Sequence, residues 1–386
     1  MMKTKIALIL CLLGYSCLAQ QVPLTRENWE GKAVFKEAGV MKLDTHSGPV
    51  VLKNYVFKDG TIEYDLKPLL PEFAYSIYFR RKDDKEQEIV YFRSKAFEIA
   101  LSANGKASSK YANDGIQYAP YLDGINMWDM YDEYQAPAQL RPNEWNRVKL
   151  VISGKRLRVF LNHSPKPALD IPELEGRTGQ GTLAFEGYCM ISNLAVYPGK
   201  TGDLHPEALP DITDHDPKYI RLWKATTPEP LPSGTEPVST RLPAPSQYTE
   251  TLSAERRGMV NLTRKFGANS GINAEGQYYT DRKIVWLKAN IVTREAFKTL
   301  LQLGFSDEIW IFLNGKMVLA DKNHFWEDIT MRKYPNGRIS IWNTRAPLQL
   351  KAGANELLIG VANDFYGWGL MARLENMEGI IDVTAD

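Results

Sequence analysis

Residues 112–137 bring together, in one short stretch, two kinds of side chain that could do chemistry jointly. The stretch reads ANDGIQYAPYLDGINMWDMYDEYQAP and mixes five aromatic side chains with five carboxylates. A sugar presents apolar C–H faces and hydroxyl rims, so its binding site pairs aromatic platforms with carboxylates, amides or guanidinium groups. Three interpretations stay open here: a sugar site, a calcium-binding loop, or a plug of packed aromatics surrounded by solvated acids.

Two further segments carry side chains of the same kinds. Arg80 and Arg93 end the neighbouring strand candidates SIYFR and VYFR, so both arginines would reach one groove if these strands share a face. The loop NDFYGWG, residues 363–369, adds Tyr366, whereas we expect Trp368 to begin the last strand and pack inward. The predicted ligand-binding residues are therefore Arg80, Arg93, Gln117, Tyr118, Tyr121, Trp128, Asp129, Tyr131, Asp132 and Tyr366.

Metal-ligand patterns give a weaker signal. The five histidines are scattered and form no H-E-x-x-H or paired-cysteine spacing, which argues against catalytic zinc. Calcium needs only oxygen ligands, so it stays open as an alternative. Two acidic runs could supply such ligands: Asp129, Asp132 and Glu133, and Asp211, Asp214 and Asp216. Neither run matches the ordered calcium-loop pattern. No other cofactor is expected.

The elements that would position these residues are short strands. PVVLKNYVF, GTIEYDLK, FAYSIYFR, QEIVYFR and FEIALS follow one another with turn residues between them, and each mixes β-branched and aromatic residues. WNRVKLVISGKRLRVFLN predicts a hairpin that turns at Ser153-Gly154. Asn314-Gly315, between two apolar runs, predicts a two-residue turn in which both residues have positive φ. The fold class is therefore all-β, with two tandem sandwich or jelly-roll domains.

Composition divides the chain into four parts. Residues 1–19 combine Lys3 and Lys5 with a short apolar run and the small-residue site SCLAQ, which predicts a signal peptide cut after Ala19. Lipid attachment at Cys17 is the alternative. A first β-domain at 20–199 and a second at 248–386 flank a linker at 200–247, where proline is dense. The protein is thus expected to be exported, to the periplasm or the outside of the cell.

Two properties of the whole chain limit its partners. Its 47 basic and 46 acidic residues are balanced, which argues against a nucleic-acid partner. No later segment is apolar for long enough to cross a bilayer. After signal cleavage only Cys189 remains, so an internal disulfide is excluded and the core must provide the stability. The oligomeric state stays open.

Both halves resemble known families. The order DGTIEYDL, SIYFR, VYFR, IQYAP, EWNRVKLVISGKRLRVFLN, GTLAFEG and ISNLAVYP, over roughly residues 22–198, resembles the concanavalin A-like or laminin G-like sandwich family. That family includes lectins, adhesion modules, laminarinase-type glycosidases and keto-disaccharide hydrolase domains. LLQLGFSDEIWIFLNGKMVLAD, LKAGANELLIGVAN and YGWGLMARLE, over roughly residues 250–380, resemble the galactose-binding-like jelly roll. The resemblance implies sugar binding, although fold alone does not assign it.

Catalysis is the point on which the chain departs from the family pattern. Laminarinase-type enzymes carry E-x-D-x-E or E-x-D-x-x-E. This chain has Glu63-Tyr64-Asp65, but Lys67 or Pro68 stands at the position of the second glutamate. Because a retaining mechanism needs two carboxylates, we assign no catalytic residue. We expect an exported binder of oligo- or polysaccharides. The alternatives are a glycoside or keto-disaccharide hydrolase working in the first-domain groove near Asp114, Asp123, Asp129 and Glu133, and an adhesion module that binds a protein.

Overall fold

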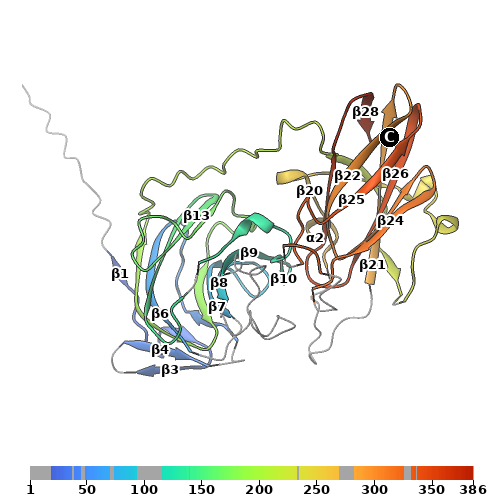
Figure 1. Cartoon of the computed structure of the whole chain (residues 1–386). Helices are drawn as coiled ribbons and strands as arrows, with labels where there is room; N and C mark the ends of the chain where they lie inside the picture. Colours follow the sequence, from blue (N-terminus) through green and yellow to red (C-terminus); the bar gives the residue numbers. More distant parts are fainter. Residues whose placement is uncertain are drawn as a thin grey trace, which may run out of the picture.

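The computed structural model describes residues 19–36, 39–44, 48–69, 74–93, 115–138, 140–232, 234–268, 282–325, 332–335 and 337–385. Its strands form two antiparallel sandwiches in tandem, which confirms the predicted all-β fold class (Figure 1). We call residues 20–198 the first sandwich and residues 222–384 the second sandwich. Among the described residues, no helix has the length and apolar character needed to cross a membrane.

One sheet of the first sandwich is built around the longest strands of that half. Its order is β14 (Leu169–Ile171), β13 (Arg156–Leu161), β12 (Asn146–Ser153), β6 (Gly60–Pro68), β16 (Cys189–Pro198), β4 (Val40–Leu43) and β3 (Ala33–Lys36), and β1 (Gln20–Gln21) also pairs with β16. Along β6 the inward Ile62, Tyr64 and Leu66 are buried, as alternation predicts. Glu63 and Asp65 point the other way and form ion pairs with Arg147.

The other sheet of the first sandwich carries the residues that matter for function. Its order is β10 (Ile125–Asn126), β9 (Ile116–Leu122), β8 (Gln87–Arg93), β7 (Ala74–Arg81), β15 (Thr182–Glu186), β5 (Val50–Leu52) and β2 (Trp29–Glu30), and β11 (Gln135–Ala136) also pairs with β9. A 3₁₀-helix, η2 (Asp132–Tyr134), precedes β11. Inner-face residues such as Ile77, Phe92 and Phe185 pack against the opposite sheet, so the core lies between the two sheets.

The second sandwich has one large and one small sheet. The large sheet is β19 (Glu250–Ser253), β17 (Leu222–Ala225), β21 (Arg282–Thr293), β26 (Gly353–Asn363), β23 (Glu308–Leu313) and β24 (Lys316–Lys322), with β18 (Glu229–Leu231) and β28 (Ile380–Thr384) also paired to β21. The small sheet is β20 (Met259–Asn261), β27 (Gly369–Leu374), β22 (Phe297–Ser306) and β25 (Thr344–Leu350). The helical turns are α2 (Leu262–Phe266), η3 (Ser239–Arg241), η4 (Pro245–Gln247) and η5 (Arg256–Gly258).

The predicted turns and the predicted linker can be compared with this structure. Asn314 and Gly315 have φ of 50° and 76°, as the hairpin prediction requires. The first hairpin forms as well, but its strands end at Ser153 and resume at Arg156, one residue later than predicted. Strands β17 and β18 lie within the segment 200–247 that composition assigns to a linker, and both pair with β21. The domain limits therefore stay a prediction, with strand pairing that reaches upstream of residue 248.

The two sandwiches are packed against each other. In Figure 1 the β9–β10 side of the first sandwich faces α2 and β20 of the second. Met259, Ile339, Ile341 and Met371 of the second sandwich are buried in the same apolar cluster as the core of the first. The backbone N–H of Ile339 also donates to the carbonyl of Asp129 at 2.8 Å. Sites at this boundary are thus built from both halves of the chain.

Candidate functional site

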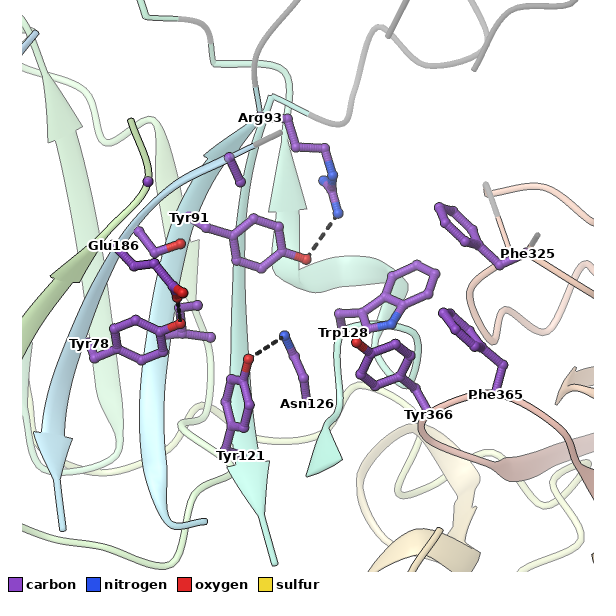
Figure 2. Close-up of a pocket in the computed structure, with 14 residues that line it drawn as sticks. Tyr78, Tyr91, Arg93, Tyr121, Asn126, Trp128, Glu186, Phe325, Phe365 and Tyr366 are labelled. Atoms are coloured by element: carbon purple, nitrogen blue, oxygen red, sulfur yellow. Dashed lines mark hydrogen bonds between the residues drawn. The ribbon is translucent and has the colours of Figure 1, made fainter. Parts of the chain in front are cut away.

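A pocket of about 340 Å³ lies between the two sandwiches, on the outer face of the sheet that contains β7, β8 and β9 (Figure 2). Because side chains alternate along a strand, Ala74, Ser76 and Tyr78 of β7 share this face. Ser76 stands opposite Tyr91 of β8 on one side and Glu186 of β15 on the other. The small Ala74 and Ser76 side chains at the centre of the sheet leave the hollow, and larger residues surround it.

One wall of the pocket is polar and comes from the first sandwich. The hydroxyl of Tyr78 donates to a carboxylate oxygen of Glu186. Across the sheet, the amide of Asn126 donates to the hydroxyl of Tyr121 at 3.3 Å. Burial raises the pKa of both tyrosines well above the usual value, so both phenols stay protonated and able to donate. The wall therefore offers a carboxylate, an amide and two phenols within one hollow.

Arg93 belongs to this polar wall, and Gln117 lies directly behind it. The Arg93 guanidinium donates to the Tyr91 hydroxyl at 2.9 Å and to Gln117 Oε1 at 2.6 Å. Gln117 Oε1 also accepts from the Tyr91 hydroxyl and from Arg338 Nη2 of the second sandwich. The Gln117 amide donates to the carbonyl of Trp128. Gln117 thus connects the pocket floor, the Trp128 loop and the second sandwich.

The opposite wall is aromatic and comes mostly from the second sandwich. The rings of Trp128 and Phe325 have centroids 4.6 Å apart at 66°, and Phe365 stacks near Phe325 at 6.2 Å. Tyr366 meets Phe365 edge-on at 4.5 Å and Trp128 at 6.4 Å. The guanidinium of Arg338 lies 5.3 Å from the Trp128 ring centre, a cation–π distance. Figure 2 shows this cluster facing the polar residues across the hollow.

A buried carboxylate holds the loop that carries two of these aromatics. Asp307 Oδ2 accepts the backbone N–H groups of Asp364 at 2.6 Å and Phe365 at 2.8 Å. The Asn363 amide donates to the carbonyl of Tyr366 at 3.1 Å, and Tyr366 itself has φ of 58°. Burial is the largest cause that raises the pKa of Asp307, to about 7. The loop conformation therefore depends on contacts that are sealed from solvent.

A second buried carboxylate, Asp129, faces the same loop from the first sandwich. Burial first, and the Asp307 carboxylate second, raise the pKa of Asp129 well above its usual value, and Arg338 offsets this only in part. Two like charges in one low-dielectric site disfavour double ionisation, so the two carboxylates favour a state in which one of them is protonated. A Cβ on Gly367 would lie 2.7 Å from Asp129 Oδ1, which explains glycine at that position.

Four of the predicted ligand-binding residues meet in this pocket: Arg93, Tyr121, Trp128 and Tyr366. Two more, Gln117 and Asp129, lie directly behind its walls. Trp128 is 7% exposed, so it belongs to the packed cluster and to the pocket wall at once. Trp368 is buried, as expected, and its indole N–H donates to the carbonyl of Gly267.

The other four predicted residues do not line the pocket. Tyr118 follows Gln117 on β9 and so points to the opposite face, into the core. Arg80 has φ of 48° at an irregular pairing between β7 and β15, and its guanidinium pairs with Asp59. Tyr131 is buried and stacks on Tyr134 at 4.7 Å. Asp132 begins η2, outside the pocket.

Sequence reasoning missed Tyr78, Tyr91, Asn126, Glu186, Phe325 and Phe365. Strand alternation from Arg93 would have found Tyr91, two residues earlier on β8. Glu186 required knowing that β15 lies beside β7, and Phe325 required knowing how the sandwiches pack. Neither relation can be read from one sequence.

Two of the acids proposed for calcium binding or hydrolysis form ion pairs with arginines outside the pocket. Glu133 pairs with Arg256 and Arg257, and Asp123 pairs with Arg177. Asp114 lies outside the described residues. Within the described ranges, no group of three or more histidine, cysteine or acidic side chains is arranged to hold a metal.

Glu186 is the single carboxylate among the described residues that line the pocket. Hydrolysis of a glycosidic bond by the usual route needs two carboxylates that flank the bond. Among the described lining residues, Glu186 therefore has no second carboxylate opposite it.

Comparisons with known proteins give matches in structure only. No family model matches the chain, and no curated protein matches it in sequence. A carbohydrate binding module from Bacillus subtilis matches at 15% identity and a TM-score of 0.32, covering 43% of this chain and 93% of the module. A putative glycosyl hydrolase from Parabacteroides distasonis matches at 15% identity and a TM-score of 0.32, and the match covers 46% of this chain and 89% of the hydrolase chain. The β-glucanase of Bacillus licheniformis matches at 8% identity and a TM-score of 0.32, and the match covers 47% of this chain and 98% of the β-glucanase chain.

Proposed function

We propose that this protein binds a glycan in the pocket between its two sandwiches. The observation that carries the proposal is the division of the pocket into a polar wall and an aromatic wall (Figure 2). A sugar ring has the same division, with hydroxyl groups at its rim and C–H groups on its faces. The pocket volume of about 340 Å³ lies at the lower end of the range for small-molecule sites. It therefore fits one or two sugar residues.

The two walls predict how the ring would lie. Its C–H face would stack on Trp128 and Tyr366, and its hydroxyls would turn toward Glu186, Asn126 and Arg93. Glu186 accepts hydrogen bonds and Arg93 donates them, so a hydroxyl between them can both donate and accept. The charged partners would make these hydrogen bonds stronger than neutral ones. Export of the protein, predicted from its first residues, would bring the pocket to extracellular or periplasmic glycans.

A glycan array tests the proposal. The purified mature protein, fluorescently labelled, should bind a small set of glycans. Glu186→Gln should reduce binding of each hit about ten- to a hundredfold, since a hydrogen bond to a charged group contributes about 1.5–3 kcal/mol. Tyr197→Ala, on β16 of the opposite sheet, is the control and should bind like the wild type. Absence of any glycan hit, together with saturable binding of a peptide or protein, would instead support the adhesion-module interpretation.

A further inference from the structure

The pocket exists only when the two sandwiches are docked. Phe325, Phe365 and Tyr366 belong to the second sandwich, and every other described lining residue belongs to the first. If the sandwiches separated, the polar wall would remain on its sheet and the aromatic wall would leave with the second sandwich. Whatever holds the sandwiches together therefore also determines the shape of the binding site.

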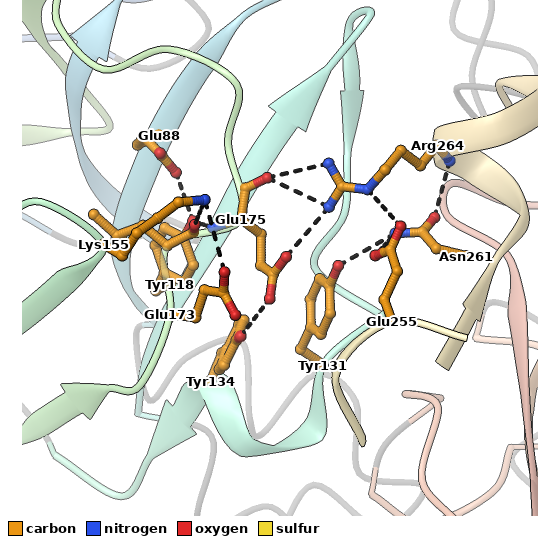
Figure 3. A network of polar contacts seen from close by, with 11 residues as sticks. Glu88, Tyr118, Tyr131, Tyr134, Lys155, Glu173, Glu175, Glu255, Asn261 and Arg264 are labelled. Atoms are coloured by element: carbon orange, nitrogen blue, oxygen red, sulfur yellow. Dashed lines mark hydrogen bonds and ion pairs between the residues drawn. The ribbon is translucent and has the colours of Figure 1, made fainter. Parts of the chain in front are cut away.

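A polar cluster near the pocket joins the sandwiches directly (Figure 3). We call it the Arg264 clamp; it consists of Tyr131, Glu175, Glu255, Asn261 and Arg264. Arg264, on α2, forms an ion pair with Glu175 of the first sandwich at 3.2 Å and with Glu255 at 2.8 Å. Its guanidinium also donates to the Glu175 carbonyl at 3.4 Å. Beside it, the Asn261 amide donates to the Tyr131 hydroxyl at 3.2 Å.

The clamp continues into the core of the first sandwich. Glu175 Oε1 accepts from the Tyr134 hydroxyl at 2.7 Å, and the Glu175 backbone N–H donates to the Tyr118 hydroxyl at 2.7 Å. Tyr118 in turn donates to Glu88 Oε2 at 2.6 Å. Glu88 and Tyr118 lie on β8 and β9, the strands that carry Tyr91, Arg93 and Gln117 of the pocket. The clamp thus connects α2 of the second sandwich to the strands of the pocket floor.

Arg264 supplies an ion pair of the clamp that joins the second sandwich to a carboxylate of the first. Glu175 is 9% exposed, so removal of the guanidinium would leave a buried carboxylate with only the tyrosine and backbone contacts. Burial is the largest cause that raises the pKa of Glu175, to about 7, even with Arg264 present. Breaking a buried pair on one side is far more destabilising than breaking an exposed pair. The docked arrangement should therefore be sensitive to this one residue.

We propose that Arg264 is a positioning residue for the glycan pocket, which it completes by holding the second sandwich against Glu175. The inference rests on the proposed function. Docking and glycan binding are then linked, so that each strengthens the other by the same factor. Arg264 acts through Phe325, Phe365 and Tyr366 and does not itself touch the sugar.

The test uses the full mature chain and four variants. Arg264→Met removes the charge and keeps the chain length, Arg264→Lys is the conservative variant, and Arg177→Met is the control. Arg177 also bridges two carboxylates, Glu86 and Asp123, but on an exposed edge of the first sandwich. Glu255→Gln, which weakens only one contact of Arg264, serves as a milder variant if Arg264→Met folds poorly.

Two measurements are made on each variant. Small-angle X-ray scattering reports docking without a ligand, and calorimetry reports Kd for laminaritetraose, for galactotetraose and for the hits of the array. Arg264→Met should expand the particle and raise Kd about tenfold if the docked fraction falls to about one tenth. Saturating sugar should restore the compact particle, which a merely structural role would not predict. Arg264→Lys should give intermediate values, and Arg177→Met should match the wild type.

The outcomes separate the two proposals. Wild-type affinity in an expanded Arg264→Met protein would overturn the linkage and leave the proposed function standing. A particle that stays compact in both Arg264→Met and Glu255→Gln would overturn the role of the clamp. Failure of the wild-type protein to bind any of the sugars would contradict the proposed function, and with it the inference.

Discussion

Replacing Trp128 by alanine tests whether the pocket wall is also a packed interface. Trp128 is 7% exposed, and its ring contacts Phe325 at 4.6 Å and the Arg338 guanidinium at 5.3 Å. Truncation of a buried tryptophan to alanine costs about 3–5 kcal/mol, because the transfer free energy and the packing contacts are both lost. For a unit of this size, 1 kcal/mol moves Tm by about 2–4 °C. Trp128→Ala should therefore lower Tm by about 6–20 °C.

Differential scanning calorimetry of Trp128→Ala and Trp145→Ala measures this effect. Trp145 is 42% exposed, so the matched change at the surface should leave the free energy of unfolding within about 0.5 kcal/mol of the wild type. Glycan affinity of Trp128→Ala should fall as well, since the stacking face and the support of Phe325 are lost together. An unchanged Tm with reduced affinity would refute the packed interface and show that Trp128 acts only as a stacking surface for the sugar. An unchanged Tm with unchanged affinity would refute both roles.

Three further predictions concern protonation, the aromatic loop and the domain limits. Burial raises the pKa of Asp307 to about 7, so the folded protein holds a proton on this carboxyl that the unfolded chain releases near pH 4. The free energy of unfolding should therefore fall as pH rises from about 4 to about 7 and then level off. Urea unfolding at pH 5 and pH 8 should show a smaller difference for Asp307→Asn than for the wild type; an equal difference would exclude Asp307 as a source of the slope. Gly367→Ala would place a Cβ 2.7 Å from a carboxylate oxygen, so it should displace the Tyr366 loop and weaken glycan binding. Gly179→Ala is the control, because its Cβ would meet no atom within 4 Å. Equal glycan affinities of the two variants would contradict the close approach at Gly367. Trypsin should cut after the exposed Arg241, yet the two fragments should co-elute in gel filtration, because β17 and β18 stay paired with β21 across the cut. Fragments that elute separately and folded would support the linker limits predicted from composition.

The fold was predictable because its signals are local. Alternation along residues 60–68 places Ile62, Tyr64 and Leu66 in the core, and the Asn314-Gly315 pair specifies its own turn geometry. Neither conclusion depends on which strands are neighbours. The limits of the second sandwich were harder to predict from the sequence, because β18 contains Pro230. Proline argues against a central strand, yet it is tolerated in a strand that pairs on one side only.

The pocket was predictable only in part because it depends on contacts between distant segments. Arg93, Tyr121, Trp128 and Tyr366 were identified by residue type in short motifs, and the structure brings them together. Arg80 lies outside the pocket because its positive φ interrupts the alternation that would have put it beside Tyr78. The aromatic wall and the Arg264 clamp depend on how the sandwiches dock, which no periodicity in the chain encodes.

Calorimetric titration of one glycan against Tyr366→Ala tests the central claim most directly. Tyr366 is half-buried, lines the aromatic wall and lies on the second sandwich, so its effect reports the composite pocket and no other surface. An aromatic contact contributes about 0.5–1.5 kcal/mol beyond the area it buries, so the Kd of the best array hit should rise about two- to tenfold. Tyr197→Ala, a half-buried tyrosine on the opposite sheet, should leave the Kd unchanged. Equal Kd values for the wild type and Tyr366→Ala would contradict the assignment of the glycan site to this pocket.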